Sequence, residues 1–355
     1  MSDRTRTAAR ICCGLLLAAL ACAPGADEGE ERTARAPIHL GWQVPWATQG
    51  QIVMALRHTN IPELVGVDLD YVGFTYGGPL NQAALAGEVD VLLTADQPAV
   101  VLLSNSEDWS IVARMMYNRV CVYVPVASPI ARLEELAGKT LQGPVGAAAE
   151  RVALGELQDR GVDLADMQLG NLDMAQQKAV LARTGEGSTR WEGADAYYGF
   201  DPLPAIFEVE GRVRMLHCGK VVSVVVASRE MTTERVDELE RFLRGFALGW
   251  LYFARNGSQA NAWFAEVSRL DVGDEVLELA ASVEPNRRAS TAGDLRLTFD
   301  GGDLATLRST QDFLLARGIV RERVDLDARI ELGPLGRALD ADLDEIYSGV
   351  RPRTR

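Results

Sequence analysis

Apolar residues in the first part of the chain form short runs separated by segments with a helical period. The runs cover residues 38–42, 89–93 and 110–115, each rich in apolar or β-branched residues and bounded by polar or turn residues, and residues 67–73 alternate between apolar and polar as a further strand. Such runs are typical of buried strands. The helical period between them predicts helices over about residues 51–57 and up to Gly87, where glycine suits a helix C-terminus. This alternation predicts an α/β fold with a mostly parallel sheet flanked by helices.

The strand over residues 89–93 organises the rest of the pattern. Thr94, Asp96 and Gln97 follow it as a predicted loop, and Pro98 then suits the start of a helix through residue 103. Ligands of open α/β sheets bind beyond the carboxyl ends of the strands. The sequence therefore predicts a binding loop here, with helix capping as the alternative role of Asp96.

A second unit begins at about residue 125, after a further predicted strand over residues 120–124. Strands over residues 140–142, 167–172, 194–198 and 213–216 alternate there with helices over residues 147–160 and 174–183. After a strand over residues 221–227, the chain becomes helical, beginning with a long amphipathic helix over residues 236–256. We predict lobe I from residues 37–124 plus 220–350 and lobe II from residues 125–219. Two chain segments cross between the lobes and would form a hinge.

Composition and charge narrow the possible partners. The chain of 355 residues is 47% apolar, which suffices for two packed lobes, and its formal net charge is -14. Nucleic acids and anionic bilayers are bound through basic surfaces. We therefore expect no nucleic-acid partner and no electrostatic binding to a membrane.

The N-terminus predicts export. Three arginines precede an apolar run over residues 11–20, which is too short to span a bilayer. Cys22 follows this run at a position that resembles a bacterial lipoprotein processing site. We predict a signal peptide over residues 1–21, lipidation of Cys22 and a flexible tether over residues 22–36, with ordinary signal-peptidase cleavage as the alternative. The protein would lie in the periplasm or at the cell surface, held to a membrane by lipid alone.

Four segments of the chain, taken in order, resemble one known family. They read AALAGEVDVLLTADQPAVV at residues 83–101, IVARMMYN at 111–118, LEELAGKTLQGPVG at 133–146 and ADAYYGFDP at 194–202. These segments resemble the solute-binding proteins of nitrate, sulfonate and taurine ABC importers, a group similar to thiamine-precursor binding proteins. The similarity covers about residues 38–255.

The resemblance implies a periplasmic-binding-protein-like clamp of type II, in which a small solute binds between two lobes. It also implies an ABC permease and an ATPase as partners, a monomer and no cofactor. A sulfonate or taurine-like organic solute is the leading expectation, with an aminopyrimidine or nitrate as alternatives. A catalytic or sensory descendant of the same fold is the alternative from another class.

Loops at strand ends and the resemblance together predict the ligand contacts. The candidates are Trp42, Gln43, Trp46, Thr48, Gln49, Tyr76, Gly77, Thr94, Asp96, Gln97, Asn118, Ala147, Ala148, Tyr198 and Asp201. Alternative roles remain open: packing for the tryptophans, a hinge role for Asn118 and helix capping for Asp201. Family members commonly carry Ser, Thr or His where this chain has Gly146 and three alanines, so backbone N–H groups would have to bind an anion there.

The charges near these loops suggest a solute with an amine. Asp96, Glu150 and Asp201 would repel a simple anion, whereas an ammonium on Asp201 and a sulfonate on residues 146–149 would suit a taurine-like zwitterion. The three histidines are scattered and follow no metal-ligand spacing. We therefore predict a non-catalytic protein without a metal site.

Two internal cysteines remain once the leader and Cys22 are set aside. Cys121 and Cys218 lie next to the two predicted crossings between the lobes. Export to an oxidising compartment favours a disulfide. Since sequence alone cannot place their Cα atoms within the distance that a disulfide requires, two buried free thiols are the favoured alternative, with the disulfide left open.

Overall fold

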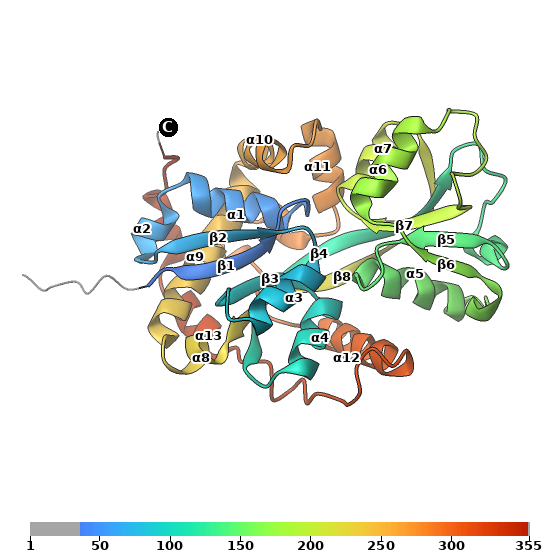
Figure 1. Ribbon diagram of the computed structural model, residues 1–355. Helices are drawn as coiled ribbons and strands as arrows, with labels where there is room; N and C mark the ends of the chain where they lie inside the picture. Colours follow the sequence, from blue (N-terminus) through green and yellow to red (C-terminus); the bar gives the residue numbers. More distant parts are fainter. Residues whose placement is uncertain (1–35, 354–355) are drawn as a thin grey trace, which may run out of the picture. The chain divides into compact units, whose positions relative to one another are not determined.

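A computed structural model describes residues 36–353 of the chain, and one eight-stranded sheet runs through them (Figure 1). The strands are β1 (Ile38–Gln43), β2 (Leu69–Phe74), β3 (Val91–Ala95), β4 (Trp109–Pro125), β5 (Thr140–Gly143), β6 (Gln168–Asn171), β7 (Ala196–Phe200) and β8 (Val213–Ser228). They lie in the order β2-β1-β3-β8-β4-β7-β5-β6. The predicted signal peptide and Cys22 lie outside the described residues.

The helices that flank the sheet are as follows. They are α1 (Gln49–His58), α2 (Ile61–Val65), α3 (Gly77–Leu85), α4 (Asp96–Asn105), α5 (Ala148–Asp159), α6 (Met174–Arg183), α7 (Leu203–Val209), α8 (Arg229–Thr233), α9 (Val236–Arg255), α10 (Gly257–Ser268), α11 (Asp274–Ala281), α12 (Gly301–Ala316), α13 (Gly333–Leu339) and α14 (Leu343–Ser348). Short 3₁₀ turns cover Leu133–Leu136, Leu164–Asp166, Pro285–Arg288 and Ala292–Asp294. Within residues 36–353, none of the helices has the length and apolar character that crossing a bilayer requires.

The helices and strands divide into two lobes (Figure 1). Lobe I holds β1–β3, α1–α4 and the C-terminal helices α8–α14, and lobe II holds β5–β7 and α5–α7. In each lobe the outer strands are parallel to one another, and the antiparallel strands β4 and β8 form the middle of the sheet. The predicted α/β clamp is confirmed, with the difference that one continuous sheet serves both lobes.

The two crossings between the lobes are single long strands. We predicted separate strands over residues 110–115 and 120–124, and again over 213–216 and 221–227, because polar residues interrupt each apolar run. This prediction was wrong, since β4 and β8 stay paired through the interruption, with Asn118 opposite Val221 and Arg119 opposite Lys220. Backbone pairing does not require apolar side chains, so the polar residues remain within the strands.

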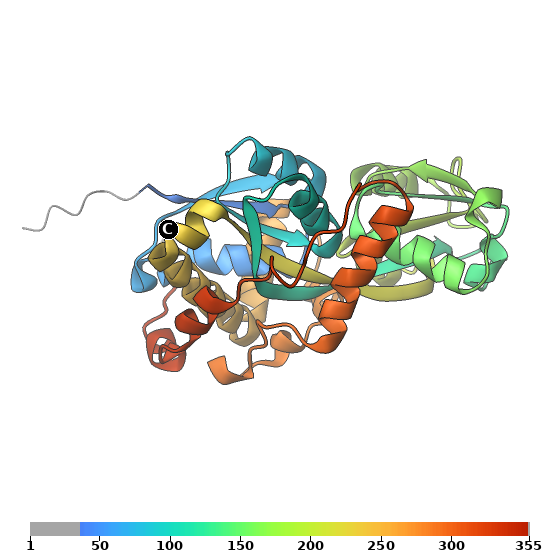
Figure 2. The ribbon, with the colours of Figure 1, turned by 90° about the horizontal axis from the view of Figure 1, so that it is seen from below.

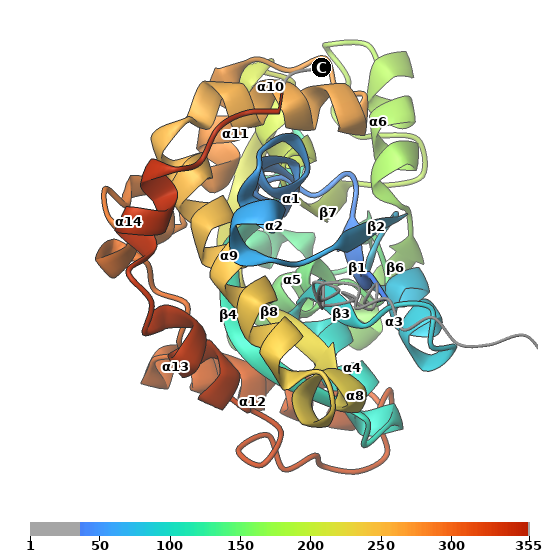
Figure 3. The same ribbon diagram turned by 90° about the vertical axis from the view of Figure 1, so that its left-hand side faces the viewer.

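Strands β1 and β3 of lobe I are buried on both faces, whereas β2, at the edge of the sheet, is only partly buried. In β3, Val91 and Leu93 pack with α1 and α9, whereas Leu92 faces the other way and packs with α3, α4 and α12. Figure 3 shows α9 running beside α1 and α2 on one side of the sheet. Side chains alternate between the faces of a strand, so a continuous apolar run fits helices on both sides.

The predicted loop after β3 is absent. The strand includes Thr94 and Ala95, and α4 begins directly at Asp96, so Pro98 is its third residue. The β-branched side chain of Thr94 suits the strand and is fully buried there. Gly87, by contrast, has the predicted positive φ, 74°, just after α3 ends.

The crossing strands are joined by a disulfide. Cys121 and Cys218 lie directly opposite each other in β4 and β8, with their Cα atoms 4.1 Å apart, and their sulfur atoms are bonded. The structure therefore has the disulfide, and the expectation of two free thiols, which the sequence favoured, was wrong. The disulfide links two strands that both pass from one lobe to the other.

Candidate functional site

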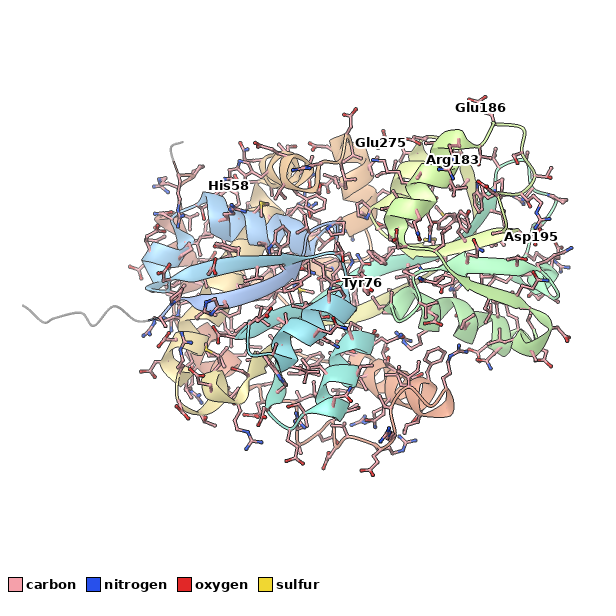
Figure 4. The ribbon with its side chains drawn as sticks, viewed as in Figure 1. His58, Tyr76, Arg183, Glu186, Asp195 and Glu275 are labelled. Atoms are coloured by element: carbon pink, nitrogen blue, oxygen red, sulfur yellow. A yellow bond between two sulfur atoms is a disulfide. The ribbon has the colours of Figure 1, made fainter. Side chains whose placement is uncertain are left out.

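A cleft lies between the two lobes and contains about 360 Å³ of space, including its opening to solvent. It is lined by Gln43, Trp46, Tyr76, Gly77, Ala95, Pro98, Asn118, Val120, Gly146, Ala147, Ala148, Ala149, Phe200 and Val221. Figure 4 labels Tyr76, which lies where lobe I faces lobe II. The lining combines both lobes with the crossing strands, as a solute clamp requires.

The structure brings part of the predicted contact set to this cleft. Gln43, Trp46, Tyr76, Gly77, Asn118, Ala147 and Ala148 line it, whereas Trp42, Thr48, Gln49, Thr94, Asp96, Gln97, Tyr198 and Asp201 do not. The additional lining residues include Val120 and Val221, which flank Asn118 on the crossing strands, and Phe200 at the end of β7. A β-branched residue beside a polar one at a strand crossing is the sequence signal that could have identified Val120 and Val221 as lining residues.

Two lining residues hold buried polar atoms without a partner in residues 36–353. Asn118 is fully buried, yet neither its amide nitrogen nor its amide oxygen has a hydrogen-bond partner, and the indole Nε1 of Trp46 has none either. Buried polar groups are nearly always hydrogen-bonded, because an unpaired one loses its water without compensation. These atoms therefore point to a ligand, or to water that a ligand replaces.

The residues directly behind the lining add further unpaired groups. Gln49 accepts a hydrogen bond from the backbone N–H of Gln43 through its Oε1, at 2.7 Å. Its Nε2 and the hydroxyl of Thr94 are both buried and without a partner in the described residues. Both can donate hydrogen bonds, so lobe I supplies several donors near the cleft.

The loop that carries Trp46 is held in an unusual conformation. Thr48 has φ 72° and ψ -58°, a sparsely populated region for a residue with a branched side chain. Its N–H donates to Oε1 of Gln51 at 2.6 Å, and Gln51 donates in turn to Asn261 of α10 at 3.0 Å. Backbone strain of this kind is retained where surrounding contacts fix it, commonly at functional sites.

Lobe II presents the N-terminus of α5 to the cleft. Residues Gly146 to Ala149 line it with small side chains only, so the first turn of the helix can approach a ligand closely. The first N–H groups of a helix lack partners within it and favour anions. The N–H of Gly146 is already used, because it donates to the carboxylate of Glu150 at 2.8 Å.

Asp201 and Asp96, two of the carboxylates that were expected to face the solute, are instead paired with arginines. Asp201 is fully buried, and its carboxylate accepts hydrogen bonds from Arg119 Nε at 2.6 Å and from the N–H of Ala205 at 2.9 Å. Burial raises the pKa of Asp201, and the Arg119 guanidinium acts against that shift. Asp96 is likewise buried and accepts a hydrogen bond from Arg151 Nη2 at 2.6 Å.

No charged side chain lines the cleft among the described residues. The repulsion that we expected between an anion and Asp96, Glu150 and Asp201 therefore has no support in this geometry. Nor do residues 36–353 gather three or more His, Cys, Asp or Glu side chains in a way that could hold a metal ion. The cleft offers neutral donors, a helix N-terminus and aromatic rings.

Solved structures share this fold. The periplasmic aliphatic sulphonate binding protein SsuA from Escherichia coli is 20% identical, with 83% of this chain and 91% of that one covered and a TM-score of 0.65. The alkanesulfonate-binding protein SsuA from Xanthomonas axonopodis pv. citri, bound to MOPS, is 18% identical, with 83% and 98% covered and a TM-score of 0.66. No curated protein matches the chain in sequence.

Enzymes also occur among the similar structures. A mutant of DszB in complex with biphenyl-2-sulfinic acid is 15% identical, with 86% of this chain and 99% of that one covered and a TM-score of 0.64, and DszB is described as a desulfurization enzyme. The fold alone therefore does not separate binding from catalysis.

A family model gives the assignment that low identity to solved structures cannot. The model described as NMT1/THI5 like matches residues 65–260, more than half of the chain, and this range includes all four segments on which the resemblance rested. Together with the fold, this match confirms the resemblance to solute-binding proteins. The chain belongs to the NMT1/THI5-like family and has the fold of periplasmic solute-binding proteins.

Proposed function

We propose that the protein is the exported solute-binding component of an ABC importer and that its cleft captures a small organic solute with a sulfonate-type anionic group. One observation carries this proposal: the cleft between the lobes is lined by uncharged residues, and Trp46 and Asn118 hold buried polar atoms there that lack partners in the described residues. The SsuA proteins with the same fold are described as sulfonate-binding, which supports this choice of solute.

The lining suggests how such a solute is held. Trp46 Nε1, the Asn118 amide and the first turn of α5 would donate to the anionic oxygens, since hydrogen bonds to a charged acceptor are the stronger ones. The organic part would lie against Trp46 and Phe200, whose ring centroids are 6.3 Å apart across the lobes, and against Val120. Contacts from both lobes exist together only in the closed form, so binding shifts the population toward closure.

The geometry of the cleft also ranks the alternative solutes and the alternative of catalysis. An aminopyrimidine or an ammonium group is bound most strongly by a carboxylate acceptor, and Asp201 is already paired with Arg119. The ranking that placed an amine on Asp201 is therefore replaced by one in which the anionic group comes first. For catalysis, the described lining supplies no thiol, imidazole or carboxylate side chain, so binding is the function that the cleft supports best.

We expect Asn118→Ala to raise the dissociation constant for ethanesulfonate by about 10- to 100-fold, because a lost hydrogen bond to a charged group costs roughly 1.5–3 kcal/mol. Titration calorimetry of the mature protein measures it, with ethanesulfonate, taurine, MOPS, nitrate and an aminopyrimidine as the panel. Asn105→Ala is the matched control, since Asn105 is an exposed residue of α4 that bonds only within its helix. Equal affinity in all three proteins would contradict the proposed site.

Export and anchoring are also part of this proposal. We infer that Cys22 is acylated after removal of residues 1–21, that the protein is a monomer held in the periplasm or at the cell surface, and that it delivers its solute to a permease and an ATPase. Mass spectrometry of the mature N-terminus is expected to show lipid on Cys22. A free α-amine at a residue after Cys22 would contradict the anchor while leaving the solute site untouched.

A further inference from the structure

Two ion pairs connect the lobes at the first turn of α5. Arg151 Nη2 of lobe II lies 2.6 Å from Asp96 Oδ2 of lobe I, and Glu150 Oε1 lies 3.7 Å from Arg317 Nη2, just after α12. Figures 1 and 2 agree that α12 belongs to lobe I and extends toward lobe II. Neither pair lines the cleft, so the solute site described above does not use them.

The Asp96–Arg151 pair is buried in the arrangement of the lobes that the structure shows. The Asp96 side chain has no exposed surface, the Arg151 side chain is 12% exposed, and Oδ1 of Asp96 accepts a hydrogen bond from the N–H of Gln97 at 2.7 Å. Asp96 is the first residue of α4, where the helix dipole favours a negative charge. The carboxylate is therefore held in place from lobe I and presented to lobe II.

The two pairs have opposite polarity. Lobe I supplies the acid of one pair and the base of the other, while adjacent residues of α5 supply their partners. A hinge opening that moves α5 away from α4 and α12 would separate both pairs at once. Since each buried charge would regain water on opening, the pairs are sensitive to the distance between the lobes.

We propose that Asp96 and Arg151 form a latch that sets the balance between open and closed lobes, with Glu150 and Arg317 as a weaker second contact. The inference rests on the proposed function, in which closure captures the solute. Affinity falls in proportion to the closed population when only that form binds, so the latch also sets the apparent affinity. Asp96 and Arg151 are thus positioning residues that act without touching the solute.

Loss of one partner of the Asp96–Arg151 pair is expected to favour the open form. Arg151→Gln leaves Asp96 charged and buried in the closed form, and opening allows that carboxylate to regain water. We expect the ratio of open to closed molecules without solute to rise about tenfold or more. Asp96→Asn is expected to shift the ratio in the same direction, and the double variant Asp96→Asn/Arg151→Gln to return part of the way, because no unpaired charge remains.

Energy transfer between the lobes measures this balance. Dyes on Leu85→Cys of α3 and Leu169→Cys of β6, both exposed side chains, report the lobe separation in the mature chain carrying Cys22→Ala. Arg132→Gln is the matched control, because Arg132 is 72% exposed and pairs only with Glu135 of its own lobe. The control is expected to leave energy transfer unchanged.

Two results would overturn the latch: unchanged energy transfer in the folded single variants, or single effects that simply add in the double variant. If Arg151→Gln does not fold, Arg317→Gln decides, since Arg317 is 37% exposed and is expected to give a smaller shift in the same direction. The energy-transfer measurement uses no solute, so a failure of the proposed sulfonate binding leaves its outcome unaffected. Normal solute binding with unchanged transfer would reject the latch alone.

Discussion

Asp201→Ala is expected to lower the free energy of unfolding by about 3–5 kcal/mol, the range for removing one partner of a buried ion pair. The substitution leaves the Arg119 side chain, which is only 8% exposed, without its closest carboxylate. Glu208 remains 2.8 Å from Arg119 and is itself 38% exposed, so the lower half of the range is the expected result. Urea unfolding followed by circular dichroism measures the change.

The matched control is Glu192→Ala in the same lobe. Glu192 is 80% exposed and lies 3.4 Å from Arg183, so its loss is expected to cost at most about 1 kcal/mol, as for a surface ion pair. If Asp201→Ala unfolded at the same urea concentration as this control and instead lost solute affinity, then Asp201 would be a ligand contact. That outcome would restore the charge arrangement expected from the sequence.

Removal of the disulfide is the second change with a large expected effect. Cys121 and Cys218 are 97 residues apart, so the bond closes a long loop in the unfolded chain and removes much of its conformational freedom. The double variant Cys121→Ala/Cys218→Ala is expected to lose about 2–5 kcal/mol of unfolding free energy, the usual cost of losing a native disulfide. Urea unfolding of the oxidised and substituted proteins measures it.

Reduction provides an independent control for that experiment. The wild-type protein unfolded in urea with a thiol reductant is expected to approach the stability of the double variant, whereas the double variant is unaffected by the reductant. Identical unfolding midpoints for oxidised wild type and double variant would contradict a stabilising bond. Two free thiols in the unreduced, denatured protein, beyond any at Cys22, would contradict the bond itself.

The sequence pattern predicts the architecture well because strands and helices are each marked by residues that are close together in the sequence. Continuous apolar runs such as Val91 to Leu93 mark strands buried on both faces, and the helical period between runs marks the flanking helices. Asn118 and Trp46 stand out as polar or aromatic residues beside such runs, and both line the cleft. These features need no knowledge of distant contacts.

The remaining features depend on partners that are far apart in the sequence. Asp201 and Asp96 look like free carboxylates in loops, but Arg119 and Arg151 bind them across 82 and 55 residues. The length of β4 is also set by its pairing with β8, which continues through the polar residues at the crossing. The sequence therefore indicates which residue types lie near the site, but it does not identify which of them pair with one another.

A crystal structure of the protein with ethanesulfonate is the decisive test of a sulfonate site in this cleft. We expect one solute between closed lobes, with sulfonate oxygens within hydrogen-bond distance of Trp46 Nε1 and the Asn118 amide, and with the first turn of α5 facing the anion. A sulfonate bound outside this cleft, or one in it that leaves both Trp46 Nε1 and Asn118 unpaired, would contradict the proposed site.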